Sequence, residues 1–169
     1  EPKDVLRDRL FRENSQKHIL LHASTPKGSE SFRPWVYETI DEYVRNLNLI
    51  ISELVSTEGY FLAIRFRETN DLSEADLRQL LLPADCYEIY SNGTFDEYLL
   101  ASDVLISYSS TTIEEALQNR IPVLQFDPDG KYAHISAPSI SSDGSLKLNS
   151  IYFCQSQFHL SPMLDFICD

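Results

Sequence analysis

The chain has 169 residues, about one domain's length, and 43% of them are hydrophobic, so it can bury a core without disulfides or a structural metal. Its 26 acidic and 14 basic residues give a net charge of −12, which argues against a nucleic-acid binder and against docking on an anionic membrane. No apolar run approaches the roughly 20 residues that span a bilayer, and the first residues do not resemble a signal peptide. Three widely spaced cysteines predict buried thiols. We therefore expect a soluble, cytoplasmic single domain, residues 1–169.

Helical patterns alternate with short apolar runs along the chain. The clearest helix is predicted at 33–55, where apolar residues recur every three to four positions, and Pro162 interrupts the last one. The other helices are expected at 3–12, 73–82 (with Ser73 as N-cap), 94–101, 112–119 and 156–167.

The apolar runs are continuous instead of alternating, which is typical of strands covered on both faces, as in a parallel sheet. They lie at residues 19–21, 60–64, 86–90, 104–106, 123–126 and 151–154. Strands and helices in this order predict an α/β fold, a doubly wound Rossmann-like domain with a mainly parallel six-stranded sheet. The segment 137–147, rich in Ser and Gly, is expected to be a mobile loop.

The strongest functional signal follows the strand at 104–106, where Ser109, Ser110, Thr111 and Thr112 lead into a helix. We call residues 109–112 the Ser/Thr turn. Unpaired backbone N–H groups at a helix start, together with the helix dipole, bind phosphate without Lys or Arg. Glu115, one turn into the helix, is placed to accept hydrogen bonds from a ribose. The alternative is that Ser110 or Thr111 only caps the helix.

The stretch from residue 95 to 126 resembles the C-terminal nucleotide-sugar-binding half of GT-B fold glycosyltransferases. The shared pieces are a Phe-led helix, an Ala-Asp pair, an apolar strand, a small-residue turn, and a Glu-Ala pair seven residues before a Pro-Val strand. Here they are Phe95, Ala101 and Asp103, residues 104–106, the Ser/Thr turn, Glu115-Ala116 and Pro122-Val123.

Two families with this fold are similar at the turn itself. UDP-N-acetylglucosamine 2-epimerases have Ser-Gly-Gly followed by Glu-Glu-Ala, where this chain has Ser109-Ser110-Thr111 and residues 114–116. CDP-glycerol glycerophosphotransferases have a Tyr-Ser-Ser element like Tyr108-Ser109-Ser110.

The resemblance implies that the Ser/Thr turn contacts the nucleotide phosphates, that Glu115 contacts the ribose, and that Phe95 and the loop 91–94 lie near the base. It also implies a nucleotide-sugar substrate, no obligatory cofactor or metal, and a catalytic base and acceptor supplied by an N-terminal domain of the same protein. The chain would then be half of a glycosyltransferase-like protein of surface polysaccharide biosynthesis, inactive alone, with its own catalytic residues unknown.

Further candidates follow the other strands, because ligands of doubly wound sheets lie beyond the carboxyl ends of the strands. The loop after the first strand offers His22, Ser24 and Lys27, and His22 stands where epimerase-like members keep a histidine. Arg65 and Arg67 share one face and could clamp an anion; the alternative is a surface ion pair with Glu68 or Asp71. Lys131 and Tyr132 follow the fifth strand and could reach a phosphate or sugar, or belong to a plain turn.

Two rival functions remain open at this point. The same site could serve sugar epimerisation or glycerol-phosphate transfer, or the domain could be a non-catalytic α/β interaction module. His18, His134 and His159 are too scattered to predict a site, and Asp165, Cys168 and Asp169 lack metal-ligand spacing.

Overall fold

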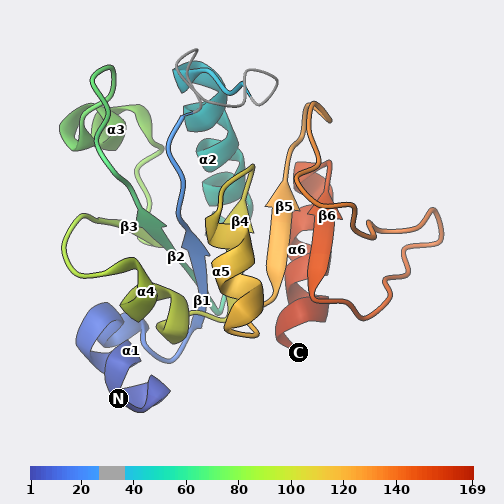
Figure 1. Ribbon diagram of the computed structural model, residues 1–169, viewed down its shortest axis with the longest axis horizontal. Helices are drawn as coiled ribbons and strands as arrows, with labels where there is room; N and C mark the ends of the chain where they lie inside the picture. Colours follow the sequence, from blue (N-terminus) through green and yellow to red (C-terminus); the bar gives the residue numbers. More distant parts are fainter. Residues whose placement is uncertain (27–36) are drawn as a thin grey trace.

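Six parallel strands form one sheet in the order β3-β2-β1-β4-β5-β6 (Figure 1). The computed structural model describes residues 1–26 and 37–169. The strands are β1 (His18–His22), β2 (Tyr60–Arg65), β3 (Tyr87–Tyr90), β4 (Val104–Ser107), β5 (Val123–Phe126) and β6 (Ile151–Cys154). The helices are α1 (Lys3–Phe11), a 3₁₀ turn (Arg12–Asn14), α2 (Ile40–Val55), α3 (Glu74–Leu80), α4 (Phe95–Ala101), α5 (Thr112–Gln118) and α6 (Gln157–Cys168). The predicted Rossmann-like α/β fold is confirmed.

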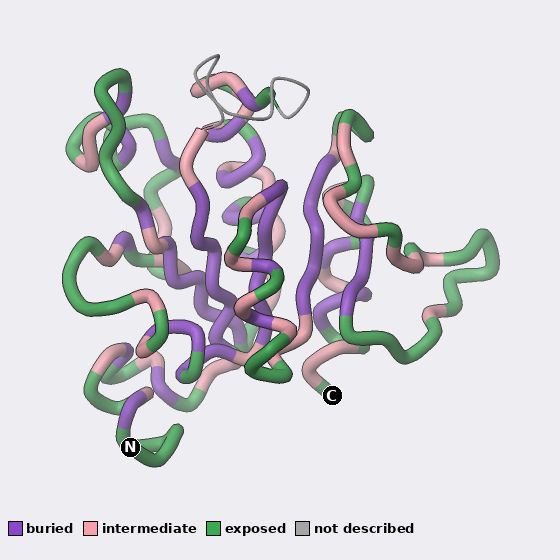
Figure 2. The backbone as a smooth tube through the Cα atoms, in the orientation of Figure 1, coloured by how far each residue is buried: buried purple, intermediate pink, exposed green. Residues whose placement is uncertain are grey.

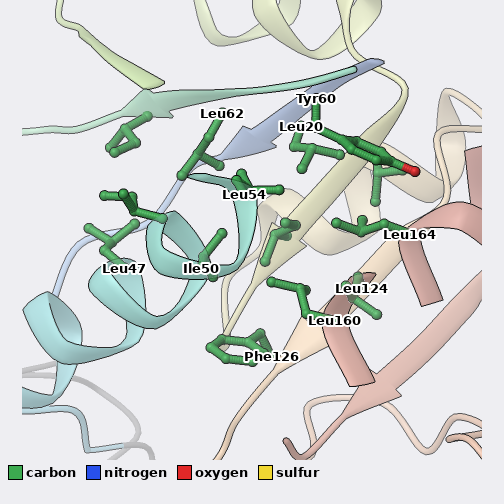
Figure 3. Close-up of a cluster of buried hydrophobic side chains, with 14 of the residues drawn as sticks. Leu20, Leu47, Ile50, Leu54, Tyr60, Leu62, Leu124, Phe126, Leu160 and Leu164 are labelled. Atoms are coloured by element: carbon green, nitrogen blue, oxygen red, sulfur yellow. The ribbon is translucent and has the colours of Figure 1, made fainter. Parts of the chain in front are cut away.

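Helices cover both faces of the sheet, which explains the continuous apolar runs in the strands (Figure 2). On one face α2, α3 and α6 enclose the larger hydrophobic cluster, in which Leu20, Leu62 and Leu124 of the sheet meet Ile50 of α2 and Leu160 of α6 (Figure 3). On the other face α1, α4 and α5 bury Leu6, Leu99 and Ile113 against the strands. The molecule is therefore three layers, helix–sheet–helix.

The strand order reverses between β1 and β4. The chain leaves β1 toward β2 and β3, then returns to place β4 on the other side of β1, followed by β5 and β6. The connections after β1 and β4 therefore diverge toward opposite faces of the sheet, which opens a crevice at the carboxyl ends of these two strands.

The long helix begins later than predicted. Residues 33–36 lie outside the described part of the chain, and α2 begins at Ile40 instead of at residue 33. The Thr39 side chain accepts a hydrogen bond from the Glu42 N–H while the Glu42 carboxylate accepts one from the Thr39 N–H, a capping box that fixes this start. Most of the predicted apolar stripe is buried, as at Leu47 and Leu54, whereas Ile40 and Val44 are half-buried.

The prediction that Pro162 interrupts the last helix is wrong. Helix α6 continues through Pro162 to Cys168. Proline in a helix costs about 3 kcal/mol because it removes one hydrogen bond and crowds the preceding turn. Pro162 is exposed, while its neighbours Leu160, Met163 and Leu164 are fully buried against the core, and this burial outweighs the cost.

The cysteines are less buried than the sequence predicts. All three cysteines are free, but only Cys154 is buried, whereas Cys86 and Cys168 are half-buried. Within the described residues no helix is both long and apolar enough to cross a bilayer, and no cluster of His, Cys, Asp or Glu has the geometry of a metal site.

Asp103, half of the Ala-Asp pair noted above, ties the first helix to the middle of the sheet. Its carboxylate accepts a hydrogen bond from the Ile19 N–H at 2.8 Å and forms ion pairs with Arg7 at 2.8 Å and Lys3 at 3.0 Å. Burial by itself would raise the pKa of Asp103, but the hydrogen bond from Ile19 and the two cations outweigh it and lower the pKa below 3.8.

We predict that Asp103→Asn destabilises the fold by about 2 kcal/mol at pH 7, because the amide loses both ion pairs. Because the folded-state pKa of Asp103 is below its unfolded value, the carboxylate stabilises the protein above that value and ceases to do so as pH falls. The difference between variant and wild type should therefore shrink below pH 3.8. Urea unfolding at pH 7 and pH 3 measures it; a difference independent of pH would contradict the assignment.

Candidate functional site

A cleft of about 870 Å³ opens where β1, β2, β3 and β4 end. We call it the carboxyl-edge cleft. Its lining residues come from the end of β2, from the loops that follow these four strands and from the starts of three helices, α3, α4 and α5. They are Ala23, Ser24, Thr25, Arg65, Phe66, Arg67, Glu68, Glu74, Ser91, Phe95, Ser110, Thr111 and Thr112. The cleft thus includes the crevice between β1 and β4.

The Ser/Thr turn forms the wall of the cleft above β4. Ser110 Oγ accepts a 3.3 Å hydrogen bond from the Thr112 N–H, and Thr112 Oγ1 donates to the Ala23 carbonyl at 3.3 Å. Thr111 is the N-cap residue by position, but its side chain makes no capping hydrogen bond and is exposed. Capping therefore accounts for Ser110 only, and the Thr111 hydroxyl is available to a ligand.

Across the cleft, the loop after β1 presents Ser24. This residue is only 7% exposed, and its Oγ has no hydrogen-bond partner among the described residues. The Tyr43 hydroxyl donates to the Ser24 carbonyl at 3.0 Å, which fixes the loop against α2. His22 is buried edge-on against the Tyr43 ring and does not line the cleft, and Lys27 lies outside the described residues.

The two arginines predicted to act together have different surroundings. Arg65 donates to the carbonyls of Tyr90, Asn92 and Gly93, and its guanidinium lies 5.1 Å from the centre of the Tyr98 ring. Arg67 is exposed and forms neither a hydrogen bond nor an ion pair with any residue that the structure describes, so the alternative of a pair with Glu68 or Asp71 is not observed. Arg65 shapes the base of the cleft, and Arg67 offers it a positive charge.

The remaining candidates divide between cleft and scaffold. Phe95 lines the cleft. Glu115 is half-exposed on α5 and does not line it. Lys131 donates to Glu42 at 2.8 Å and to the Tyr37 carbonyl, which joins the loop after β5 to the region where α2 begins.

Tyr132 also belongs to this loop after β5, which we define as residues 127–135 and call the β5 loop. Its N–H donates to the Asp127 carboxylate at 2.8 Å, and its ring packs edge-on against His134. Neither Lys131 nor Tyr132 lines the carboxyl-edge cleft.

The structure adds His134, which the sequence analysis did not assign to the site. Ser109 Oγ lies 3.0 Å from His134 Nδ1, and His134 Nε2 lies 2.9 Å from Glu114 Oε1. Ser109 is 3% exposed, and it faces this histidine instead of lining the cleft with the rest of the Ser/Thr turn. The one available signal was that loops after neighbouring parallel strands, here β4 and β5, end at the same edge of a sheet.

No protein-family model matches the sequence, and no curated protein is significantly similar to it. Solved structures with this fold include a protein described as a UDP-N-acetylglucosamine 2-epimerase from Listeria monocytogenes, with 14% identity over 75% of this chain and a TM-score of 0.50. Two variants of the wall teichoic acid polymerase TagF each match 96% of this chain, with 18% and 19% identity and TM-scores of 0.57 and 0.53.

These similarities confirm, for the fold, the resemblance seen in residues 95–126. The epimerase-like and TagF structures are GT-B proteins, and this chain has the arrangement of one part of them. It spans 30% of the epimerase-like chain and 37% of each TagF chain. The similarities therefore establish the fold of this chain, whereas the activity, substrate and partner domains of the whole protein can only be proposed.

We predict that Arg65→Lys destabilises the protein by about 2 kcal/mol, because an ammonium group cannot reproduce the planar contacts to three carbonyls and the stacking on Tyr98. Arg67→Lys is the matched control and should leave stability unchanged within about 0.5 kcal/mol, since Arg67 is exposed. Urea unfolding measures both. Equal effects of the two substitutions would show that Arg65 does not organise the loop.

Proposed function

We propose that the carboxyl-edge cleft binds the diphosphate of a nucleotide-activated donor, and that the chain is the nucleotide-sugar-binding domain of a glycosyltransferase-like protein of surface polysaccharide biosynthesis. The observation that carries the proposal is the make-up of the cleft at the β1–β4 reversal. There the hydroxyls of Ser24 and Thr111 line one cavity together with the guanidinium of Arg67, which pairs with none of the described residues.

The chemistry of these groups suits a diphosphate better than a neutral ligand. Hydroxyl groups donate hydrogen bonds to phosphate oxygens, and an arginine can hold two of them at once. Small side chains in the turn let a phosphate approach the backbone N–H groups closely. An acidic protein can bind an anion in this way, because donors at short range outweigh a net charge screened beyond about 8 Å at physiological salt.

The same contacts would assist the transfer of the donor's sugar. Negative charge develops on the diphosphate as the bond to the sugar breaks, and donors fixed around it stabilise that charge. None of these contacts calls for a metal. In this proposal the catalytic base and the acceptor site come from another domain of the same protein, so the chain binds donor and turns none over by itself.

The similarity to TagF over 96% of this chain favours glycerol-phosphate transfer as the second candidate function for the same cleft. A non-catalytic interaction module is the remaining alternative.

Titration calorimetry with UDP, GDP, CDP and CMP separates these proposals. Binding of a nucleoside diphosphate in preference to CMP supports the donor site, and binding of CDP alone favours glycerol-phosphate transfer. The absence of binding heat with any nucleotide at millimolar concentration would contradict both and favour the interaction module.

We predict that Thr111→Val and Arg67→Gln each weaken binding of the preferred nucleoside diphosphate about 10-fold, through loss of one hydrogen bond and one ionic contact respectively. Arg120→Gln is the control for charge, because Arg120 is exposed and precedes β5 at the opposite edge of the sheet. It should bind as the wild type does. Unchanged affinity in both cleft variants would place the nucleotide elsewhere.

Glu115 has its own test, since it does not line the cleft of the unliganded protein. If Glu115 holds the ribose, Glu115→Ala should weaken UDP about 10-fold and leave inorganic pyrophosphate unaffected. Glu115→Gln, which keeps an acceptor oxygen, should retain part of the affinity for UDP. Equal loss for UDP and pyrophosphate would exclude a ribose contact.

A further inference from the structure

We propose that His134 is a positioning residue for the Ser/Thr turn. It holds Ser109 in place from behind, so that Ser110, Thr111 and Thr112 face the carboxyl-edge cleft. This inference rests on the proposed function, because it concerns how the diphosphate site is kept in shape before a ligand arrives.

Two buried polar side chains fix the backbone around His134. Gln125, on β5 and 0% exposed, donates to the Ile135 carbonyl at 2.7 Å and accepts from the Ile135 N–H at 2.9 Å. Asp127, 1% exposed, accepts from the N–H groups of Asp129 and Tyr132. A buried glutamine in a parallel strand is costly unless it is fully hydrogen-bonded, and here both of its polar atoms hold the residue next to His134.

The hydrogen-bond partners of His134 define which nitrogen of its imidazole ring carries the hydrogen. A carboxylate only accepts, so His134 Nε2, which faces Glu114 Oε1 at 2.9 Å, carries a hydrogen. In the neutral ring Nδ1 is then the acceptor, and the Ser109 hydroxyl donates to it at 3.0 Å. Both nitrogens are engaged and the side chain is only 5% exposed, so His134 acts through position and not as a proton carrier for a ligand.

The β5 loop also joins the helices of both faces of the sheet. On one side Asp129 pairs with Arg45 and Lys131 pairs with Glu42, both on α2. On the other side His134 is hydrogen-bonded to Glu114 on α5. The loop therefore spans the carboxyl edge, and its contact with Ser109 sets the Ser/Thr turn relative to both layers.

Two substitutions separate the contacts of the ring, because the amide of Asn occupies the place of Nδ1 and the amide of Gln that of Nε2. His134→Asn keeps an acceptor for the Ser109 hydroxyl but loses the hydrogen bond to Glu114. His134→Gln keeps a donor to Glu114 but loses the hydrogen bond from Ser109. His159→Asn, at an exposed histidine of α6, is the matched control. Urea unfolding of every variant shows that the comparison is made between folded proteins.

The affinity for the preferred nucleoside diphosphate, measured by calorimetry, is the first readout. We expect His134→Gln to weaken binding about 10-fold, the effect of one lost hydrogen bond, and His134→Asn to stay within about 3-fold of the wild type. The double variant Ser109→Ala/His134→Gln should bind as weakly as either single variant, because both remove the same contact. Equal affinity of the Asn and Gln variants, or additive losses in the double variant, would overturn the proposal.

Amide hydrogen exchange in the unliganded protein is the second readout and needs no nucleotide. Exchange at residues 110–113 should accelerate about 10-fold in His134→Gln and remain near the wild-type rate in His134→Asn and His159→Asn. If the wild type binds no nucleotide, the donor proposal fails, and these exchange rates still decide whether His134 holds the turn. Unchanged exchange in His134→Gln would show that it does not.

Discussion

Burial of a parallel sheet on both faces is the constraint on which the rest of this structure depends. Once helices cover both faces, the strands must be mainly apolar, and most polar side chains of the sheet gather at the two edges where the strands begin and end. The reversal of strand order between β1 and β4 then leaves a crevice at the carboxyl edge. Every group that we assign to the cleft lies at the carboxyl end of β1, β2, β3 or β4, in the loop that follows it or at the start of the next helix.

Charged and polar residues near that edge have two distinct tasks. Arg65 and Lys131 use their donors on backbone carbonyls or on Glu42, so they hold loops in place. The side chains of Arg67 and Thr111 make no hydrogen bond or ion pair with the described residues, and our proposal assigns them to the ligand. This division matters for function, because fixed loops present the ligand-binding groups without a further cost of ordering them.

The buried polar network behind the Ser/Thr turn extends this division to the interior. Gln125 and Asp127 are both almost fully buried, and each is satisfied by backbone groups of the β5 loop. Such groups destabilise a core when they are half-satisfied, whereas fully bonded they specify one arrangement. Here that arrangement places His134 of the β5 loop against Ser109 and Glu114, which lie at least 20 residues away from it in the sequence.

The sequence by itself determined the strands, the order of the helices and the run of hydroxyl residues that forms the Ser/Thr turn, because these depend on local periodicity and on residues close together in the chain. The sequence-based predictions are wrong at two places. A capping box sets the start of α2, and the burial of α6 outweighs the helix-breaking effect of Pro162. Only the tertiary structure separated Arg65 from Arg67 and paired Ser109 with His134. These outcomes depend on contacts across 25 residues or more, which no local spacing encodes.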